Sequence, residues 1–266
     1  MSPRAVLLFD IDGVIRDVGG SYRRAIVETV HHFSGQRPDA SAIDSLKSEG
    51  CWNNDWEASL ELLRRSGHSP LPAFETLVDV FGCFYFGGDP EGDSGLWQGF
   101  IGSEPLLVES DFFAALTRAN VAWGFVSGAE PPSCRYVLET RLGLREPPLV
   151  AMGQAPDKPD PTGLLRLASQ LAGAALDQAS PPIAYLGDTV ADVLTVQRAR
   201  HQCPAARFLS LAVAPPHLQT PEAIELRAAY EARLIEAGAD VVLPCTRALE
   251  PEALVRWLSA PSPPAP

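Results

Sequence analysis

The stretch that decides the fold is Ala5–Asp12, AVLLFDID, in which an uninterrupted apolar run ends in acidic residues. An apolar run of this length without alternation is typical of a strand buried on both faces, as the strands of a parallel sheet are. The run stops at Asp10-Ile11-Asp12-Gly13, where glycine permits a sharp turn. The sequence therefore predicts a buried strand whose end carries two acidic side chains.

Helical spacing follows this strand. From Tyr22 to Phe33 apolar side chains recur on one side of a predicted helix, and further helices are predicted at 42–47, 55–65 and 73–84. The segments between them offer no convincing strand, and Gly87–Gly95 (GGDPEGDSG) is the strongest linker signal in the chain. We expect residues 19–89 to form an all-helical domain inserted after the first strand.

Strands and helices alternate beyond the linker. Strands are predicted at 122–126, 148–152, 183–186, 207–213 and 240–243, with helices at 110–119, 132–142, 162–172, 191–200, 221–236 and 251–258. Such alternation indicates a parallel sheet with helices on both faces. The predicted fold class is α/β: a Rossmann-like, doubly wound parallel sheet in residues 1–18 and 90–258 with an inserted helical domain. The Pro/Ser-rich tail, 259–266, is expected to be disordered.

Charge and composition limit the partners. The net charge of -12 and the pI near 4.8 argue against nucleic acid and anionic membrane surfaces, which both require a basic face. No apolar stretch approaches the roughly 18 residues of a membrane span. The cysteines are scattered without a CxxC pair, which favours a reducing compartment. We expect a soluble, cytoplasmic protein, and the sequence leaves its oligomeric state open.

Polar residues follow several of the predicted strands, where open parallel sheets bind ligands. Asp10 and Asp12 come first, and two carboxylates so close together repel each other unless a cation lies between them. A hard divalent cation such as Mg²⁺ suits oxygen ligands of this kind and also suits a phosphate group. The alternative is a strand end that is acidic without a metal.

Two further residues occupy similar positions. Ser127, in FVSGA, ends a predicted strand ahead of a helix, where its hydroxyl can donate to a phosphate oxygen. Prolines near Lys158, in KPDP, hold its backbone extended, and its ammonium group offers a compact positive charge. An ordinary Ser-Gly turn and a solvated loop lysine are the alternatives for these two residues.

The most specific pattern is YLGDTVADV, Tyr185–Val193. Gly187 allows a tight turn after an apolar strand, and Asp188 and Asp192 are then spaced so that both can face one point beyond the sheet. A helix N-terminal charge would explain Asp192 alone. It would not explain the Gly-Asp-x-x-x-Asp pattern after a strand.

FDIDGVI, FVSGA, KPDP and YLGDTVADV together resemble the four motifs of the haloacid dehalogenase (HAD) superfamily, in the same order. The resemblance extends from Ala5 to about Leu243, and the helical insertion looks like the cap of subfamily I. RDVGGSYRRAIVETV and CWNNDWEASLELL are similar to an uncharacterised, phosphatase-like branch of subfamily IA.

The resemblance implies a role for each acidic residue. Asp10 would attack phosphorus and form an aspartyl-phosphate, while Asp12 would protonate the leaving group and then deprotonate water. Mg²⁺ would be held by Asp10, the backbone carbonyl of Asp12 and Asp188, with Asp192 bound directly or through water. Ser127 and Lys158 would hold the phosphoryl oxygens.

The implied activity is hydrolysis of a small phosphorylated metabolite, a phosphate monoester, by an Mg²⁺-dependent phosphatase. A phosphomutase similar to β-phosphoglucomutase, using the same aspartyl-phosphate, is the first alternative. A non-catalytic binding protein on the same fold is the second, although such a protein would need neither the acidic quartet nor Lys158.

Substrate choice is expected in the inserted domain. Arg16 lies close to its first helix and is a candidate substrate contact, although a surface arginine is the default interpretation. WNNDW (Trp52–Trp56) places Asn53, Asn54 and Asp55 between aromatic residues, as a recognition patch for a polar leaving group would. Capping of the following helix by Asn54 or Asp55 is the competing interpretation.

Overall fold

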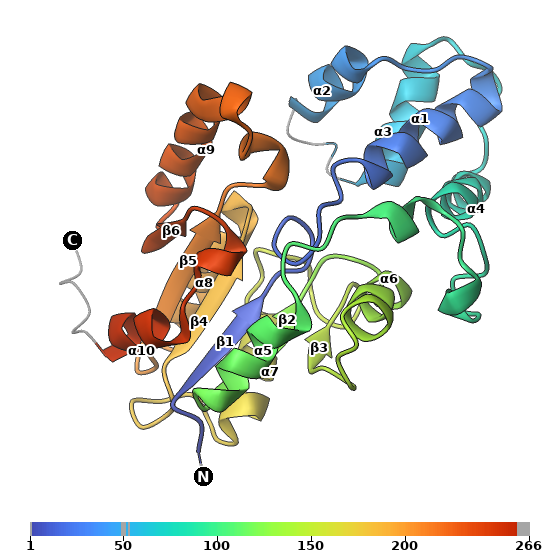
Figure 1. Cartoon of the computed structure of the whole chain (residues 1–266). Helices are drawn as coiled ribbons and strands as arrows, with labels where there is room; N and C mark the ends of the chain where they lie inside the picture. The colour runs from blue at the N-terminus through green and yellow to red at the C-terminus, as the bar shows by residue number, and fades with distance from the viewer. Residues whose placement is uncertain (1, 49–51, 53, 260–266) are drawn as a thin grey trace. The chain divides into compact units, whose positions relative to one another are not determined.

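The computed structural model describes residues 2–48, 52 and 54–259. The chain forms two compact units, one made of Met1–Asp17 with Leu106–Pro266 and the other of Val18–Pro105. Figure 1 labels the helices and strands of both units. None of the described helices is long and apolar enough to cross a membrane.

The first unit is built on a sheet of six strands, all parallel, in the order β3-β2-β1-β4-β5-β6. The predicted α/β class with a doubly wound parallel sheet is thereby confirmed. Strand β1 lies in the centre, where Phe9 pairs with Phe125 of β2 and with Leu186 of β4. The strands are β1 (Ala5–Phe9), β2 (Val121–Val126), β3 (Leu149–Val150), β4 (Ile183–Gly187), β5 (Phe208–Val213) and β6 (Val241–Leu243).

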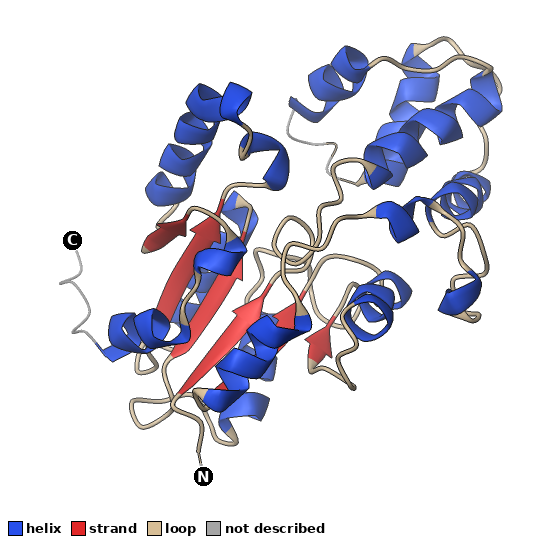
Figure 2. Cartoon of the chain, viewed as in Figure 1, coloured by secondary structure: helices blue, strands red, loops and turns tan. Residues whose placement is uncertain are grey.

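Helices cover both faces of this sheet, as Figure 2 shows in blue against the red strands. The side chains of β1 alternate between two buried clusters: Leu7 and Phe9 join one, and Val6 and Leu8 join the other. The first cluster includes residues of α5 (Ser110–Arg118), α6 (Pro131–Arg135) and α10 (Pro251–Ser259). The second includes residues of α7 (Thr162–Ala172) and α8 (Val190–Gln202), and α9 (Ile224–Glu236) packs beside β6. Apolar side chains therefore bury β1 on both faces.

The segment predicted as one helix over 132–142 departs from regular α-helix. Helix α6 ends at Arg135 and continues as a π-helical segment, Tyr136–Arg141. The predicted helix over 221–236 likewise begins with a short 3-10 turn, Pro221–Ala223, which has Pro221 at its first position. The predicted tail beyond Ser259 lies outside the described residues.

The second unit is all-helical over its described residues. Its helices are α1 (Ser21–Ser34), α2 (Ala40–Ser48), α3 (Asp55–Arg65) and α4 (Phe74–Tyr85), followed by 3-10 turns at Ser94–Leu96 and Phe100–Ser103. Helix α1 packs against α3 and α4, and the rings of Tyr22 and Tyr85 stack with centroids 4.6 Å apart.

The second unit extends to Pro105, whereas the sequence placed the end of the inserted domain at residue 89. The glycine-rich stretch Gly87–Gly95 turns the chain back onto α4 instead of leading out of the unit. The amide of Gly99 donates to the carbonyl of Phe86 at 2.9 Å, and the ring of Trp97 lies 4.8 Å from that of Phe86. The assignment of the two units as catalytic core and cap stays a prediction.

Candidate active site

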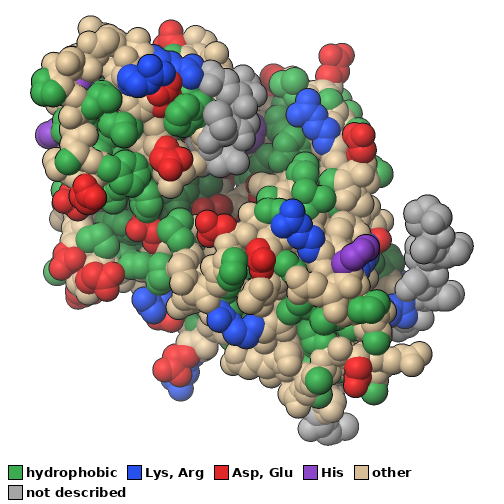
Figure 3. Space-filling model, turned by 180° about the vertical axis from the view of Figure 1, so that it is seen from behind, with side chains coloured by type: hydrophobic (Ala, Val, Ile, Leu, Met, Phe, Trp, Pro, Cys, Tyr) green, Lys and Arg blue, Asp and Glu red, His purple; other side chains and the backbone are tan. Residues whose placement is uncertain are grey.

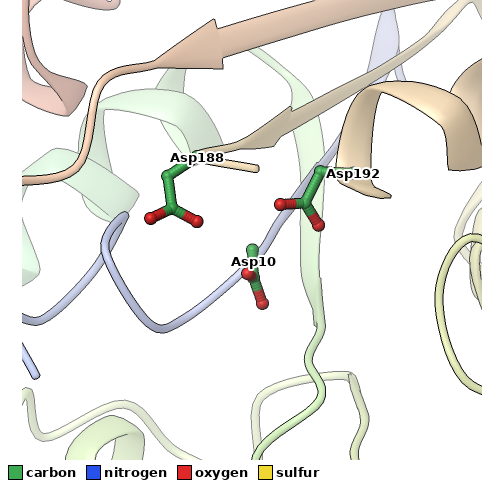
Figure 4. A group of neighbouring side chains, drawn as sticks. All are labelled: Asp10, Asp188 and Asp192. Carbon is green, nitrogen blue, oxygen red and sulfur yellow. The ribbon is translucent and has the colours of Figure 1, made fainter. Parts of the chain in front are cut away.

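Three buried carboxylates meet at the carboxyl ends of β1 and β4. Asp10 follows β1, Asp188 follows β4 and Asp192 lies in the first turn of α8, and one oxygen of each lies within 4.8 Å of the other two. Figure 4 shows these side chains gathering from the three elements. The pairing of β1 with β4 places the first two together, and the amide of Asp10 donates to the carbonyl of Leu186 at 2.9 Å.

Two glycines make room for this group. A Cβ atom on Gly13 would lie 2.0 Å from Oδ2 of Asp188, and one on Gly187 would lie 2.2 Å from Cβ of Asp192. Gly13 also has a φ of +74°, a conformation that side chains with a Cβ rarely adopt. The glycines of the two acidic motifs are therefore required by the close approach of the carboxylates.

Lys158 supplies positive charge to this group from the loop ahead of α7. Its Nζ lies 2.9 Å from Oδ2 of Asp10 and 2.6 Å from Oδ1 of Asp192. Burial by itself would lower the pKa of the ammonium group, but the charges of Asp10 and Asp192 raise that pKa well above its ordinary value. Lys158 is therefore a fixed cation beside the Asp10 carboxylate.

Both carboxylate oxygens of Asp192 accept hydrogen bonds from other residues of the chain. Its Oδ2 accepts hydrogen bonds from the amide and the hydroxyl of Thr189, at 3.0 and 2.6 Å, in a capping box at the start of α8. Its Oδ1 lies 2.6 Å from Lys158 Nζ and 3.0 Å from the hydroxyl of Tyr185. Burial would raise the pKa of Asp192, but the charge of Lys158 and these hydrogen bonds lower it.

Asp10 and Asp188 are compensated less completely: Asp10 pairs with Lys158, and Asp188 forms no ion pair among the described residues. Burial, chiefly, raises the pKa of Asp10 to about 7 against the opposing charge of Lys158. Burial, together with the charge of Asp192, raises the pKa of Asp188 well above its ordinary value. Oδ1 of Asp10 is buried and accepts no hydrogen bond from the described residues. Two carboxylates with one orphaned oxygen fit a hard divalent cation with oxygen ligands.

The Asp12 carboxylate is not part of this group. Its Oδ1 accepts a hydrogen bond from Nε of Arg16 at 2.7 Å, and its side chain is 26% exposed. The loop that carries it is closed by hydrogen bonds from the amide of Gly13 to the carbonyl of Arg16 and from the amide of Ile15 to that of Ile11. The two aspartates of FDIDGVI therefore have different partners: Lys158 for Asp10 and Arg16 for Asp12.

Ser127 directly follows β2, at the same edge of the sheet. Its side chain is buried, and its hydroxyl oxygen accepts a hydrogen bond from the amide of Ala129 at 3.1 Å. The Ser-Gly turn that the sequence offered as an alternative is therefore present. The hydroxyl proton is not used in this bond, so Ser127 can still donate to a ligand.

No family model matches the chain. Among curated proteins, an imidazoleglycerol-phosphate dehydratase from Phytophthora nicotianae is 30% identical over 248 residues, which cover 91% of this chain and 50% of that protein. The chain therefore spans about half the length of this curated relative.

Solved structures match over nearly the whole chain. A phosphatase from Thermococcus thioreducens is 21% identical with a TM-score of 0.62, covering 86% of this chain and 99% of its own. A phosphonoacetaldehyde hydrolase-like protein from Oleispira antarctica is 17% identical with a TM-score of 0.67, covering 98% and 96%. A HAD hydrolase of family IA, variant 3, from Entamoeba histolytica is 12% identical with a TM-score of 0.58, covering 96% and 100%.

The chain has the HAD fold. The structure brings together four residues of the predicted HAD motifs, Asp10, Lys158, Asp188 and Asp192, through contacts within the group. Ser127 lies at the same edge, and the Asp12 side chain is turned to Arg16. The catalytic and metal-binding roles of these residues in this HAD-fold protein stay predictions.

The candidate substrate residues lie in three different settings. Arg16 is fully buried in the HAD-fold unit, so the default interpretation of a surface arginine is wrong. Asn54 caps α3, where its Oδ1 accepts hydrogen bonds from the amides of Trp56 and Glu57 at 2.9 and 3.1 Å. Asp55 is the first residue of α3, and Asn53 lies outside the described residues. Contact of these residues with a substrate is untested.

Three residues that form hydrogen bonds to Asp188 or Asp192 were not predicted from the sequence. Tyr185 and Thr189 hold Asp192, and the hydroxyl of Tyr230 donates to the backbone carbonyl of Asp188 at 2.9 Å. Thr189 precedes Asp192 by three positions, a capping-box spacing that could have identified it. No sequence signal marks Tyr230, because α9 is brought to the site only by the fold.

Proposed function

We propose that this protein is an Mg²⁺-dependent hydrolase of small phosphate monoesters in which Asp10 forms an aspartyl-phosphate. The observation that carries the proposal is the Asp10 carboxylate, with one oxygen orphaned and the other 2.9 Å from Lys158 Nζ. It lies beside Asp188 and Asp192 at the carboxyl end of the central strand. The HAD fold of the chain supports the same assignment.

Each residue contributes a distinct step. A carboxylate oxygen of Asp10 attacks phosphorus, and the bond to the leaving oxygen breaks as Asp12 protonates that oxygen. Asp12 then takes a proton from the water that attacks the aspartyl-phosphate, which releases phosphate and restores Asp10. Lys158 and the Ser127 hydroxyl bind the phosphoryl oxygens as charge develops on them.

The oxygens of Asp10 and Asp188 are the side-chain ligands that the geometry favours for Mg²⁺, and the resemblance to HAD proteins adds the Asp12 backbone carbonyl. Mg²⁺ would neutralise charge on the phosphoryl group and on the nucleophile. Asp192 is assigned to holding Lys158, because its oxygens already accept hydrogen bonds from Thr189, Tyr185 and Lys158. Any contact of Asp192 with the ion would then pass through water.

Small metabolites fit this site better than polymers do. On the face of the molecule in Figure 3, Lys and Arg side chains stand as separate spots among acidic and hydrophobic ones. With a net charge of -12, such a surface does not favour nucleic acid or anionic membranes. The name of the Phytophthora relative adds imidazoleglycerol phosphate to the esters that should be screened. A cytoplasmic location is part of the same proposal.

The deciding experiment measures phosphate released from a panel of phosphorylated metabolites by wild type, Asp10→Asn and Asp79→Asn with Mg²⁺. Asp79→Asn is the matched control, since it makes the same change at an exposed position of α4. We expect the Asp10 variant to lose at least about a thousandfold in kcat, and the control to remain active. EDTA should abolish wild-type activity, Mg²⁺ should restore it, and Ca²⁺ should restore it poorly.

The same assay separates the alternatives. Product that retains phosphate, with activation by a sugar bisphosphate, would identify a phosphomutase. Inertness of the wild type across the whole panel would favour a non-catalytic binding protein. Asp10→Asn turnover within about tenfold of wild type would remove Asp10 from its assigned role.

A further inference from the structure

Arg16, a residue of the first unit, carries a fully buried guanidinium group. Its side chain is 0% exposed, and it is the largest side chain among the fully buried ones of the described residues. Charged side chains are rarely buried to this degree unless specific partners hold them. Two partners are evident: Nε donates to Oδ1 of Asp12 at 2.7 Å, and Nη2 donates to the Ser133 hydroxyl at 2.8 Å.

The backbone of Arg16 is fixed as firmly as its side chain. Its carbonyl accepts the amide of Gly13 at 2.9 Å, and its own amide donates to the carbonyl of Ile11 at 3.2 Å. Bridges of β type link Arg16 to Asp12 on one side and to Leu106 on the other. The guanidinium therefore meets Asp12 from an anchored turn, with little freedom to move away.

This contact leaves one oxygen of Asp12 available. Oδ1 is held by Arg16, whereas Oδ2 accepts no hydrogen bond from the described residues. A carboxyl group on a partly exposed loop would otherwise sample several rotamers, and only some of them would point an oxygen toward a reacting group. Because Arg16 fixes Oδ1, the rotamer of Asp12 is set, and so is the direction in which Oδ2 points.

We propose that Arg16 is a positioning residue that holds Asp12 in place for proton transfer to the leaving group. The inference rests on the proposed phosphatase function and replaces a direct contact of Arg16 with substrate. As the bond from phosphorus to the leaving oxygen breaks, the electron pair stays on that oxygen and Oδ2 of Asp12 gives it a proton. Arg16 neither gains nor loses a proton in this step.

Burial argues against the substrate contact. Turning the guanidinium toward a ligand would break its hydrogen bond to the partly exposed Asp12 carboxylate and its hydrogen bond to the buried Ser133 hydroxyl, at a cost in free energy. A purely structural role, in which Arg16 merely ties its turn to Ser133 on α6, is the remaining competitor. The two roles differ in how they affect substrates with different leaving groups.

The test compares an alkyl phosphate with p-nitrophenyl phosphate. An alkoxide must be protonated as it leaves, whereas p-nitrophenolate leaves without a proton, so only the alkyl ester needs a well-placed Asp12 in the first step, the formation of the aspartyl-phosphate. The comparison is therefore made on kcat/KM, which reports this first step, because hydrolysis of the aspartyl-phosphate is common to both esters. For Arg16→Gln we expect kcat/KM on the alkyl ester to fall about tenfold to a hundredfold, and kcat/KM on p-nitrophenyl phosphate to fall less than about threefold. Asp12→Asn should show the same split in kcat/KM, whereas its kcat should fall for both esters because Asp12 also activates the water of the second step.

Two further variants complete the experiment. Arg118→Gln makes the same substitution at an exposed position of α5 and should leave both esters unaffected. Arg16→Lys keeps the positive charge near Asp12 and should restore part of the alkyl ester activity. If Arg16→Gln fails to fold, the lysine variant decides the matter, because a smaller split in the same direction is expected from it.

The outcomes separate this inference from the function on which it rests. Wild type that hydrolyses neither ester would remove the proposed function and the inference with it. Wild type that hydrolyses both, with equal losses in the Arg16 variants, would overturn the positioning role alone. A split in Asp12→Asn without one in the Arg16 variants would overturn it too.

Discussion

At the scale of single residues, the site depends on how its buried negative charges are compensated. Lys158 lies between Asp10 and Asp192, and Asp192 accepts further hydrogen bonds from Thr189 and Tyr185. Asp188 forms no ion pair among the described residues, and burial raises its pKa. Without a metal ion, Asp188 therefore opposes the stability of the fold in its ionised form.

Asp188→Asn should therefore raise the melting temperature of the metal-free protein and abolish its response to Mg²⁺. An amide has the same shape without the buried charge, and it is a poor ligand for a hard cation. Mg²⁺ at a hundred times its Kd should stabilise wild type by about 2.7 kcal/mol. Thermal melts with EDTA and with Mg²⁺ measure both effects, and Asp79→Asn should respond to Mg²⁺ as wild type does. An undiminished Mg²⁺ response in Asp188→Asn would exclude Asp188 as a ligand.

The position of a site residue was predicted well where the residue follows a strand end. It was predicted poorly where distant segments or an irregular turn set the residue's surroundings. Asp10, Asp188 and Asp192 follow strands or begin a helix, so the topology alone places them together. The burial of Arg16 was not predicted. Its contact with Asp12 has helical spacing but comes from a β-bridged turn, which a pattern of residue types does not reveal.

At the scale of elements, the start of α3 is the feature with two competing roles. Asn54 caps this helix through its side-chain oxygen, and the same residue is a candidate contact for a leaving group. A cap acts on stability, whereas a substrate contact acts on the kinetics of one ester and spares another. The two roles are therefore separable by experiment.

Asn54→Ala should lower the free energy of unfolding by about 1 kcal/mol, because two amides of α3 lose their acceptor. If Asn54 only caps the helix, kcat/KM should change equally for a natural ester and for p-nitrophenyl phosphate. Asn54→Asp keeps the acceptor and should preserve stability. Denaturant unfolding and paired kinetics give the answer. A loss of about tenfold or more on the natural ester alone would assign Asn54 to recognition.

The elements themselves were largely predictable from periodicity. The helices of the second unit and the strands β1, β4 and β5 follow from apolar spacing alone. The glycine-rich stretch Gly87–Gly95 is predicted to be a linker, but its composition does not say what the chain packs against afterwards. The contacts of Gly99 and Trp97 with Phe86 decide that, and they keep residues 90–105 in the second unit.

At the scale of the whole molecule, strand order is the property that the sequence leaves open. Alternating strands and helices predict a parallel sheet, but the position of β1 between β2 and β4 is known only from the pairing. The second unit is contiguous in the chain, from Val18 to Pro105, whereas the first is assembled from two separate segments.

The central position of β1 has a consequence for synthesis on the ribosome. Ala5–Phe9 leaves the ribosome before either of its neighbours, Val121–Val126 and Ile183–Gly187, has been made. Until then its apolar side chains have no sheet to join, and such exposed segments favour aggregation and chaperone binding. Val18–Pro105 can pack its helices meanwhile, because local contacts form without waiting for distant ones.

Stalled nascent chains should show this order directly. A chain that exposes residues up to 105 should contain a protease-resistant helical fragment, while Ala5–Phe9 remains cleavable. Resistance of that first strand should appear only once β4 and α8 have emerged, since the strand is then paired on both edges and covered on one face. Brief proteolysis of chains stalled at increasing lengths would measure the transition, and early protection of the first strand would contradict it. The strand that leads into the candidate nucleophile would thus be made before both of its neighbours and would be among the last elements to fold.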